Sequence, residues 1–127
     1  VNNTALAGHV YIGDWAILSG YTLVHQFCKI GAHSFTGMGT AVGKDIPAYV
    51  MVAGNPAEAK SINAEGLRRR GFSSEEIATI TKAYKLIYRR GLTIDEALVE
   101  LEVLLPSCER LLPLIQSIKE STRGIVR

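Results

Sequence analysis

Aliphatic residues recur every six positions in the first part of the chain. Residues 4–51 divide without gaps into eight six-residue units: TALAGH, VYIGDW, AILSGY, TLVHQF, CKIGAH, SFTGMG, TAVGKD and IPAYVM. The third residue of each unit is mostly aliphatic, while the first and fourth are mostly small. This period matches neither a helix nor the two-residue alternation of a strand, so it predicts a repeat architecture, a hexapeptide parallel β-helix.

If three units make one triangular coil, residues eighteen apart should stack in the packed interior. We expect the small fourth residue at a corner, where a large side chain would crowd the turn and glycine tolerates positive φ. His25 and Tyr49 are the exceptions to this rule. The predicted columns are Leu6/Val24/Val42, Ile12/Ile30/Ala48 and Thr4/Thr22/Thr40.

The repeat pattern stops near Gly54-Asn55-Pro56, because a proline cannot extend a central strand. We therefore expect two subdomains, the β-helix coils over residues 1–52 and a helical subdomain over residues 53–127. Helix signals follow the break. They are an Asn63 cap for a helix ending at Arg70, capping boxes at Ser73-x-x-Glu76 and Thr93-x-x-Glu96, and an apolar stripe from about Leu111 to Ser121 that tolerates Pro113 only in its first turn.

Composition adds little to this interpretation. The net charge is +2, with two Lys/Arg and three Asp/Glu in residues 1–59, so the positive excess belongs to the helical half. The two cysteines form no CxxC motif, which favours a reducing, cytoplasmic setting. No apolar run reaches the length of a membrane span. Because eight units make fewer than three coils and begin without a polar cap, we expect the C-terminal part of a longer protein.

Several motifs together resemble one family, the acyl-ACP:UDP-N-acetylglucosamine O-acyltransferases that begin lipid A synthesis. The matching segments extend from one end of the chain to the other. They are Asn2-Asn3-x-x-Leu6-Ala7-Gly8-His9, Val24-His25-Gln26-Phe27-Cys28, Gly54-Asn55, Asn63-x-Glu65-Gly66-Leu67-x-Arg69-Arg70-Gly71-Phe72-Ser73, Ala83-Tyr84-Lys85-Leu86-Ile87-Tyr88-Arg89 and Ser121-Thr122-Arg123-Gly124.

The resemblance implies a left-handed β-helix, assembled as a homotrimer with active sites between neighbouring prisms. It also implies transfer of a 3-hydroxyacyl group from acyl carrier protein to the 3-hydroxyl of UDP-N-acetylglucosamine, without a metal or other cofactor. In this family the general-base histidine lies one coil before His9, upstream of residues 1–127. We therefore expect this chain alone to be inactive, although its parent protein would be an enzyme.

The resemblance also assigns roles to individual residues. The Gly8 backbone N–H is a candidate oxyanion donor. Arg69 and Arg70 suit the diphosphate, because a guanidinium can bind two phosphate oxygens. Met38 falls where the family measures acyl-chain length, and its side chain should close a groove that glycine would leave open. The expected donor then has about ten carbons instead of about fourteen. The implied substrate-binding residues are His9, His25, Gln26, Asn63, Glu65, Arg69 and Arg70.

Other interpretations remain open for several of these residues. His25 could be a solvated corner histidine and His9 an exposed histidine at a strand end, and Met38 could fill an irregular surface gap. His33 has no role implied by the family, and we expect it on the surface. The three histidines lack zinc-ligand spacing. The basic side chains expected to dock acyl carrier protein could equally serve solubility, and no motif supports nucleic-acid binding. They are Lys60, Lys82, Lys85, Arg89 and Arg90.

Two other functions compete with this prediction. One is a different hexapeptide acyltransferase, such as an N-acyltransferase acting on an amino sugar. The other is a trimeric module that binds a carrier protein without catalysis. A histidine in the coil before His9 would favour the transferase, and acetyl-CoA as the donor would contradict it.

Overall fold

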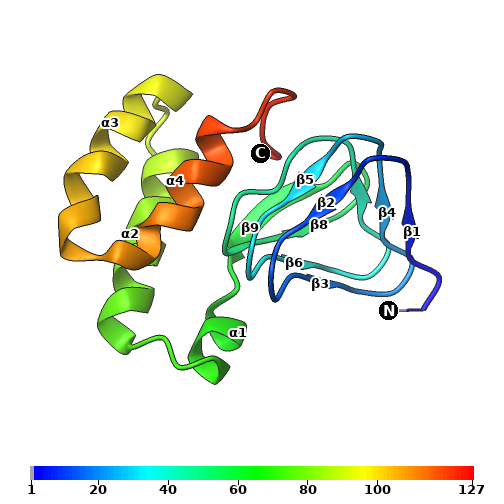
Figure 1. Cartoon of the computed structure of the whole chain (residues 1–127), viewed down its shortest axis with the longest axis horizontal. Helices are drawn as coiled ribbons and strands as arrows, with labels where there is room; N and C mark the ends of the chain where they lie inside the picture. Colours follow the sequence, from blue (N-terminus) through cyan, green and yellow to red (C-terminus); the bar gives the residue numbers. More distant parts are fainter. Residues whose placement is uncertain (1) are drawn as a thin grey trace.

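The computed structural model describes residues 2–127, and their first half forms a three-sided prism (Figure 1). Strands β1 to β8 are parallel within their sheets, and through β7 the paired residues are eighteen apart, as with Leu6 and Val24. This confirms a parallel β-helix built from six-residue units. Sheet A holds β1 (Ala5–Leu6), β4 (Leu23–Val24) and β7 (Ala41–Val42); sheet B holds β2 (Tyr11–Ile12) and β5 (Lys29–Ile30); sheet C holds β3 (Ile17–Leu18), β6 (Phe35–Thr36), β8 (Val50–Ala53) and β9 (Glu58–Ile62).

The third residue of each inner unit points into the prism, as predicted. Val24 and Val42 are each 3% exposed and Ile30 is fully buried, whereas Leu6, in the outermost described coil, is half-exposed. The first positions are buried from the fourth unit on, including Thr22 and Cys28. Apolar side chains from three sheets therefore fill one narrow core.

The corner chemistry differs from the expectation. Positive φ falls on the sixth residue of the first six units, for example 58° at His9 and 65° at Phe27, and on Tyr49 in the eighth unit, but on none of the small fourth residues. The fourth residue is small because the next coil approaches it closely. A Cβ on Gly31 would lie 2.3 Å from the Ala48 nitrogen, and one on Gly13 would lie 2.6 Å from the Ala32 nitrogen. Crowding was the correct part of the prediction, and glycine's conformational freedom was the wrong part.

The register of the eighth unit was also wrong. Ile46, not Ala48, pairs with Ile30, so the third coil is two residues shorter than the others. The ladder continues in this new register, since β6 pairs with β8 through Phe35 and Met51. Ile46 and Ala48 are both apolar, so the sequence pattern fits either register. The Asp45 carboxylate helps select the shorter coil, because its Oδ1 accepts the Lys29 N–H at 2.8 Å.

We expected the sheet to end at residue 52, but it continues through a hairpin. β8 reaches Ala53, and β9 pairs with it in the antiparallel sense from Val50↔Ile62 to Ala53↔Glu58, with an irregularity after Met51. Pro56 lies in the turn between these strands, where its missing N–H costs no ladder hydrogen bond. The helical subdomain therefore begins after Ile62.

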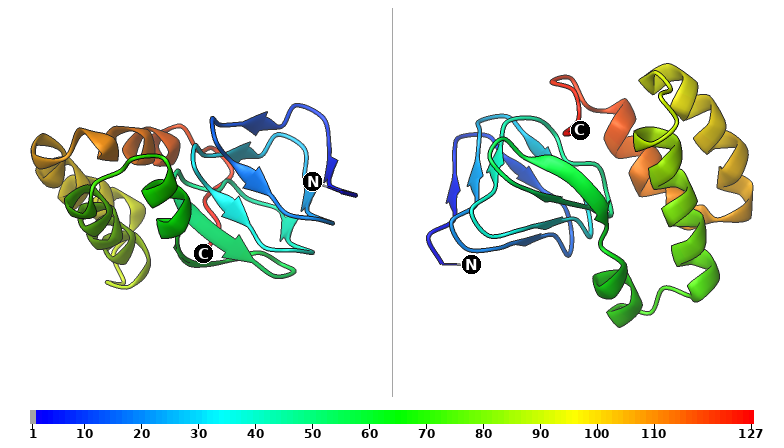
Figure 2. Two further views of the ribbon diagram at one scale, coloured as in Figure 1. Left: turned by 90° about the horizontal axis from the view of Figure 1, so that it is seen from below. Right: turned by 180° about the vertical axis from the view of Figure 1, so that it is seen from behind.

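The helices lie together at one side of the prism (Figures 1 and 2). All three predicted caps are confirmed: Asn63 accepts the Gly66 N–H, and Ser73 and Thr93 each form a capping box with the glutamate three residues on. Pro113 falls in the first turn of the last helix, as required. The helices are α1 (Ala64–Arg69), α2 (Ser74–Tyr88), α3 (Ile94–Leu104) and α4 (Leu112–Lys119), with 3-10 turns η1 (Leu105–Ser107) and η2 (Glu109–Leu111) before α4.

After α4 the chain returns to the prism and pairs with it. The Asp45 N–H donates to the Gly124 oxygen at 3.0 Å, and the Val126 N–H donates to the Asp45 oxygen at 2.8 Å. Ile125 and Val126 are buried. The C-terminal residues thus bind the prism at the shortened coil, where Figure 2 shows the chain end beside the sheets.

Candidate functional site

The predicted site residues lie at two of the three corners of the prism and on helix α1. The AB corner, between sheets A and B, carries Gly8-His9 and Gln26-Phe27; the BC corner carries Trp15, His33 and Tyr49; and the CA corner carries Tyr21 and Met38. Helix α1 follows β9 at the edge of sheet C. These places separate the predicted residues into groups that a single prism cannot bring together.

The AB corner holds four of the predicted residues. The His9 ring stacks on Phe27 with centroids 5.0 Å apart and planes inclined by 3°. His9, His25 and Gln26 are exposed, and a Cβ placed on Gly8 would meet no atom within 4 Å. This corner therefore presents an imidazole, an amide and an accessible backbone to a ligand outside the prism.

His25 also contacts the C-terminal segment. Its Nδ1 lies 3.2 Å from the Gln26 oxygen and 3.4 Å from Arg123 Nη2. His25 also lines a cavity of about 380 Å³, together with Asn55 and Pro56. Sequence reasoning matched Arg123 to the family only as part of a motif, without a role, and the contact with His25 depends on a fold-back that no local pattern encodes.

Helix α1 brings four predicted residues to one groove. Asn63, Glu65, Arg69 and Arg70 line a cavity of about 310 Å³, opposite the outward side chains of sheet C, which are Ile17, Phe35 and Met51. The groove thus combines an apolar floor with an amide, a carboxylate and two guanidinium groups. Such a combination suits a ligand that has both a ring and an anionic group.

Within this groove the polar side chains differ in how firmly they are held. Asn63 is buried: its Oδ1 accepts the Gly66 N–H at 3.3 Å and its Nδ2 donates to the His33 oxygen at 3.0 Å. Glu65 is exposed and pairs with Arg68 at 2.8 Å and Arg69 at 3.3 Å. Solvent-exposed pairs of this kind contribute little to stability, so Glu65 and Arg69 can reorganise around a ligand.

Arg70 is more constrained than Arg69. Its Nη1 lies 3.0 Å from His33 Nδ1, and its guanidinium carbon lies 5.4 Å from the centre of the Trp15 ring. Both contacts come from the BC corner. The two neighbouring arginines, which look equivalent in sequence, therefore have different environments.

His33 was expected on the surface, and the structure corrects this. Its half-buried ring stacks on Tyr49 at 5.7 Å and meets the edge of Phe72 at 5.2 Å. Burial, followed by the charges of Arg70 and Arg110, lowers the pKa of His33 below its ordinary value. The sequence signal was its sixth position in a unit, but the aromatic partners come from residues 16 and 39 positions further on.

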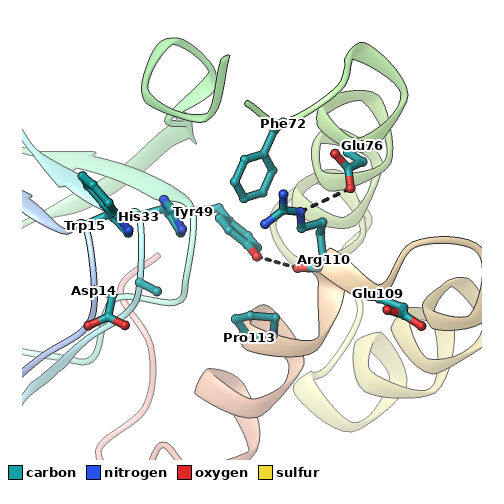
Figure 3. Close-up of a pocket in the computed structure, with 10 residues that line it drawn as sticks. Asp14, Trp15, His33, Tyr49, Phe72, Glu76, Glu109, Arg110 and Pro113 are labelled. Atoms are coloured by element: carbon teal, nitrogen blue, oxygen red, sulfur yellow. Dashed lines mark hydrogen bonds and ion pairs between the residues drawn. The ribbon is translucent and has the colours of Figure 1, made fainter. Parts of the chain in front are cut away.

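His33 forms one wall of a cavity of about 580 Å³ between the prism and the helices (Figure 3). Across it, Arg110 pairs with Glu76 at 3.2 Å and lies 4.0 Å above the Phe72 ring, and the Tyr49 hydroxyl donates to the Arg110 oxygen at 2.5 Å. The buried hydroxyl has its pKa raised to about 12, mainly by desolvation. These contacts connect the BC corner to α2 and η2.

The remaining predicted residues stand apart. Met38 is 78% exposed at the CA corner, away from α1 and the AB corner. Lys82, Lys85 and Arg89 are exposed at helical spacing on one side of α2, while Lys60 on β9 lies 3.6 Å from Glu58. Residues 2–127 contain no cluster of three metal-ligating side chains and no helix long and apolar enough to span a membrane.

Parallel hexapeptide coils followed by a small helical subdomain, with polar side chains at the corners, define the chain as a hexapeptide-repeat protein. A family model described as "Udp N-acetylglucosamine O-acyltransferase; Domain 2" matches residues 45–126, and the chain belongs to this family. The resemblance inferred from the motifs is thereby confirmed.

Individual relatives match over the whole chain. An acyl-[acyl-carrier-protein]–UDP-N-acetylglucosamine O-acyltransferase of Ectopseudomonas mendocina is 67% identical over 127 residues, which are 100% of this chain and 49% of the relative. The solved UDP-N-acetylglucosamine O-acyltransferase of Moraxella catarrhalis superposes with a TM-score of 0.97 at 46% identity, covering 99% of this chain and 49% of that one. An Arabidopsis UDP-N-acetylglucosamine acyltransferase gives 0.91 at 42%, covering 99% and 47%. The chain thus spans about half the length of these relatives.

Proposed function

We propose that the parent protein transfers an (R)-3-hydroxyacyl group from acyl carrier protein to the 3-hydroxyl of UDP-N-acetylglucosamine, the first step of lipid A biosynthesis. The observation that carries the proposal is identity of 67% along the entire chain to a relative bearing this enzymatic name. The grouping of Asn63, Glu65, Arg69 and Arg70 in one groove supports it, because these are the residues assigned to the nucleotide sugar.

In this proposal the α1 groove binds the nucleotide sugar. Arg69 and Arg70 neutralise the diphosphate, and Asn63 and Glu65 hydrogen-bond the uridine or sugar. His9, His25 and Gln26 contact the sugar from the AB corner. Because that corner and the groove lie on different parts of one prism, the complete site forms between two subunits of a homotrimer.

The reaction needs a base that residues 1–127 do not supply in this proposal. A histidine one coil upstream of His9 accepts the proton of the sugar 3-hydroxyl, and the oxygen attacks the thioester carbonyl carbon. The resulting oxyanion accepts a hydrogen bond from the Gly8 N–H. Its collapse forms the ester and expels the carrier thiolate, which is protonated to the thiol. No metal or cofactor takes part, and the enzyme is cytoplasmic.

The acyl carrier protein is acidic in this proposal and docks on the basic side of α2. Lys82, Lys85 and Arg89 supply this surface, with Arg90 beyond the helix end and Lys60 on the neighbouring hairpin. Complementary charge of this kind mainly raises the association rate, so transfer should slow as ionic strength increases.

The test is an assay of the full-length protein with UDP-N-acetylglucosamine and a 3-hydroxyacyl carrier protein. The expected product is the 3-O-acyl nucleotide sugar, with residues 1–127 alone inactive and the full-length protein sedimenting as a trimer. Transfer from acetyl-CoA to an amino group, with acyl carrier protein inert, would contradict the proposal. So would binding of the carrier protein without any transfer.

A further inference from the structure

His33 contacts both ends of helix α1. Its main-chain oxygen accepts a hydrogen bond from Asn63 Nδ2, the cap at the start of the helix, at 3.0 Å. Its Nδ1 lies 3.0 Å from Nη1 of Arg70, the cap at the end of the helix. Both partners belong to the groove assigned to the nucleotide sugar.

The direction of the second hydrogen bond follows from the chemistry of the pair. A guanidinium only donates, so His33 Nδ1 must accept and the imidazole must carry its proton on Nε2. A protonated His33 would have no acceptor for Arg70 and would add a like charge beside it. The charged groups facing the ring are Arg70 from α1, Arg110 from η2 and Asp14 from the BC corner, and burial with the two arginines keeps the imidazole neutral by lowering its pKa.

The ring of His33 is itself held in place. Tyr49, 1% exposed, stacks on it, and Phe72 meets it edge-on, while the Tyr49 hydroxyl is fixed to the Arg110 oxygen. The Trp15 ring provides the second contact of the Arg70 guanidinium. These contacts hold the ring, and with it the acceptor nitrogen, in one orientation; Figure 3 shows the His33, Tyr49 and Phe72 rings near one another.

We propose that His33 is a positioning residue for nucleotide-sugar binding: its neutral imidazole orients Arg70 toward the diphosphate, and its main chain anchors the helix that carries the other contacts. This rests on the proposed function, which assigns the nucleotide sugar to the α1 groove. Within residues 2–127, Arg69 pairs only with the exposed Glu65 carboxylate, so its guanidinium supplies charge without a fixed orientation. Fixing a side chain before binding reduces the entropy lost when the ligand arrives.

The chain itself indicates suitable substitutions. The equivalent corner positions hold Phe27 at φ 65° and Asn3 at φ 59°, so both residue types fit the backbone of His33 at φ 58°. His33→Phe keeps an aromatic ring and removes the acceptor. His33→Asn removes the ring, but its Oδ1 stands close to the place of Nδ1. The two variants therefore separate the hydrogen bond from the stacking.

The first experiment measures UDP-N-acetylglucosamine binding to the full-length protein by calorimetry. His33→Phe should raise the Kd about tenfold or more, because a hydrogen bond to a charged group is lost, whereas His33→Asn should stay within about threefold of wild type. In an Arg70→Ala background His33→Phe should add less than about twofold, since both changes remove the same interaction. Equal Kd values for wild type and His33→Phe, or Asn as weak as Phe, would overturn the positioning role. Thermal unfolding confirms that each variant is folded.

The second experiment judges the pairing without any nucleotide. In histidine-labelled full-length protein, nitrogen NMR should show His33 unprotonated at Nδ1, with a pKa below the ordinary 6.5 that rises in Arg70→Ala. An Nδ1–H tautomer, or a pKa that Arg70→Ala leaves unchanged, would overturn the pairing. If the NMR result holds and wild-type protein binds no UDP-N-acetylglucosamine, the proposed function fails, and with it the ligand assigned to Arg70.

Discussion

At the residue scale, this fold makes unequal demands on glycines that occupy the same position in the repeat. Gly31 and Gly43 are both fourth residues without positive φ, yet the next coil crosses directly over Gly31 and leaves open space beside Gly43. A coil of normal length approaches Gly13 in the same way, so the difference arises because a further coil lies over Gly31 and none of the described residues lies over Gly43. Glycine is therefore required at the fourth position only where the backbone of the next coil lies against it.

Gly31→Ala should destabilise the fold by about 1–3 kcal/mol, because the new methyl group would lie 2.3 Å from the Ala48 nitrogen and the backbone must move. Gly43→Ala is the matched control and should be neutral or slightly stabilising, by about 0.4–1 kcal/mol, through the unfolded chain. Chemical denaturation at one fixed protein concentration measures both. A loss of stability equal in the two variants would refute the close-approach explanation.

Met38 is the residue whose predicted role in acyl-chain length is not tested by the fold. Its side chain is exposed at the CA corner, as a residue that lines a groove in the proposed trimer would be. Met38→Gly in the full-length protein should shift donor preference from about ten carbons toward longer chains, with each accommodated CH₂ contributing about 0.8 kcal/mol. Competition between carrier proteins loaded with chains of different length measures the shift. An unchanged preference would remove Met38 from this role.

At the scale of the element, the helices owe their ends to side chains close in sequence. The Ser73 hydroxyl accepts the Glu76 N–H at 3.0 Å, and the Glu76 carboxylate accepts the Ser73 N–H at 2.9 Å. Glu76 also pairs with Arg110 of η2. The start of α2 is therefore fixed locally and then joined to the wall of the large cavity.

Ser73→Ala should cost about 1 kcal/mol of stability, because the first turn of α2 loses an acceptor for its free N–H. Thr79→Ala, a hydroxyl deletion on the exposed face of the same helix, should change stability by less than about 0.5 kcal/mol. Urea unfolding followed by circular dichroism compares the two. Equal effects would mean that the capping box contributes nothing specific.

The pKa of Glu76 is lowered, chiefly by the hydrogen bond from the Ser73 N–H and further by Arg110. A carboxyl whose pKa is lower in the folded state stabilises that state above its ordinary value of 4.5 and loses this contribution as the pH falls through the lowered value. Glu76→Gln keeps an acceptor for the cap without the charge. It should therefore unfold with a weaker pH dependence below 4.5 than wild type, and parallel acid-unfolding curves would contradict this.

At the scale of the whole molecule, hydrogen bonds join the prism to α4 and to the C-terminal residues. The Ala48 N–H donates to Ser117 Oγ of α4 at 3.1 Å, and the C-terminal residues pair with Asp45. Both contacts fall on the shortened third coil. The last residues of the chain therefore pair with the third coil at the AB corner, where Arg123 also reaches His25, while α4 contacts the BC corner through Ser117 and Ala48.

Val126→Ala tests whether packing of the C-terminal residues on the prism stabilises the fold. Val126 is 3% exposed against the prism and Val103 on α3 is 73% exposed, so the same substitution removes two methylene equivalents from very different surroundings. We expect Val126→Ala to cost about 2 kcal/mol and Val103→Ala less than about 0.5 kcal/mol. Thermal unfolding of the two variants at matched protein concentration measures both losses of stability. A small effect of Val126→Ala would mean that the C-terminal segment is not part of the cooperative core.

The sequence by itself determined the six-residue period, the inward third positions, the three helix caps and the family, because each depends on residues near one another in the chain. It also placed Asn63, Glu65, Arg69 and Arg70 on one short helix. These features need only local spacing and side-chain chemistry, and the structure agrees with them.

Only the tertiary structure decided the rest. The two-residue shortening of the third coil was hidden because Ile46 and Ala48 are both apolar, and hydrophobicity alone cannot choose between the two registers. The ring of His33 packs against Tyr49 and Phe72, and its Nδ1 accepts a hydrogen bond from Arg70. Each of these contacts joins segments that are distant in the sequence. Such contacts exist only once the coils are stacked and the helices packed against them, and for that reason no local pattern could distinguish His33 from a surface histidine.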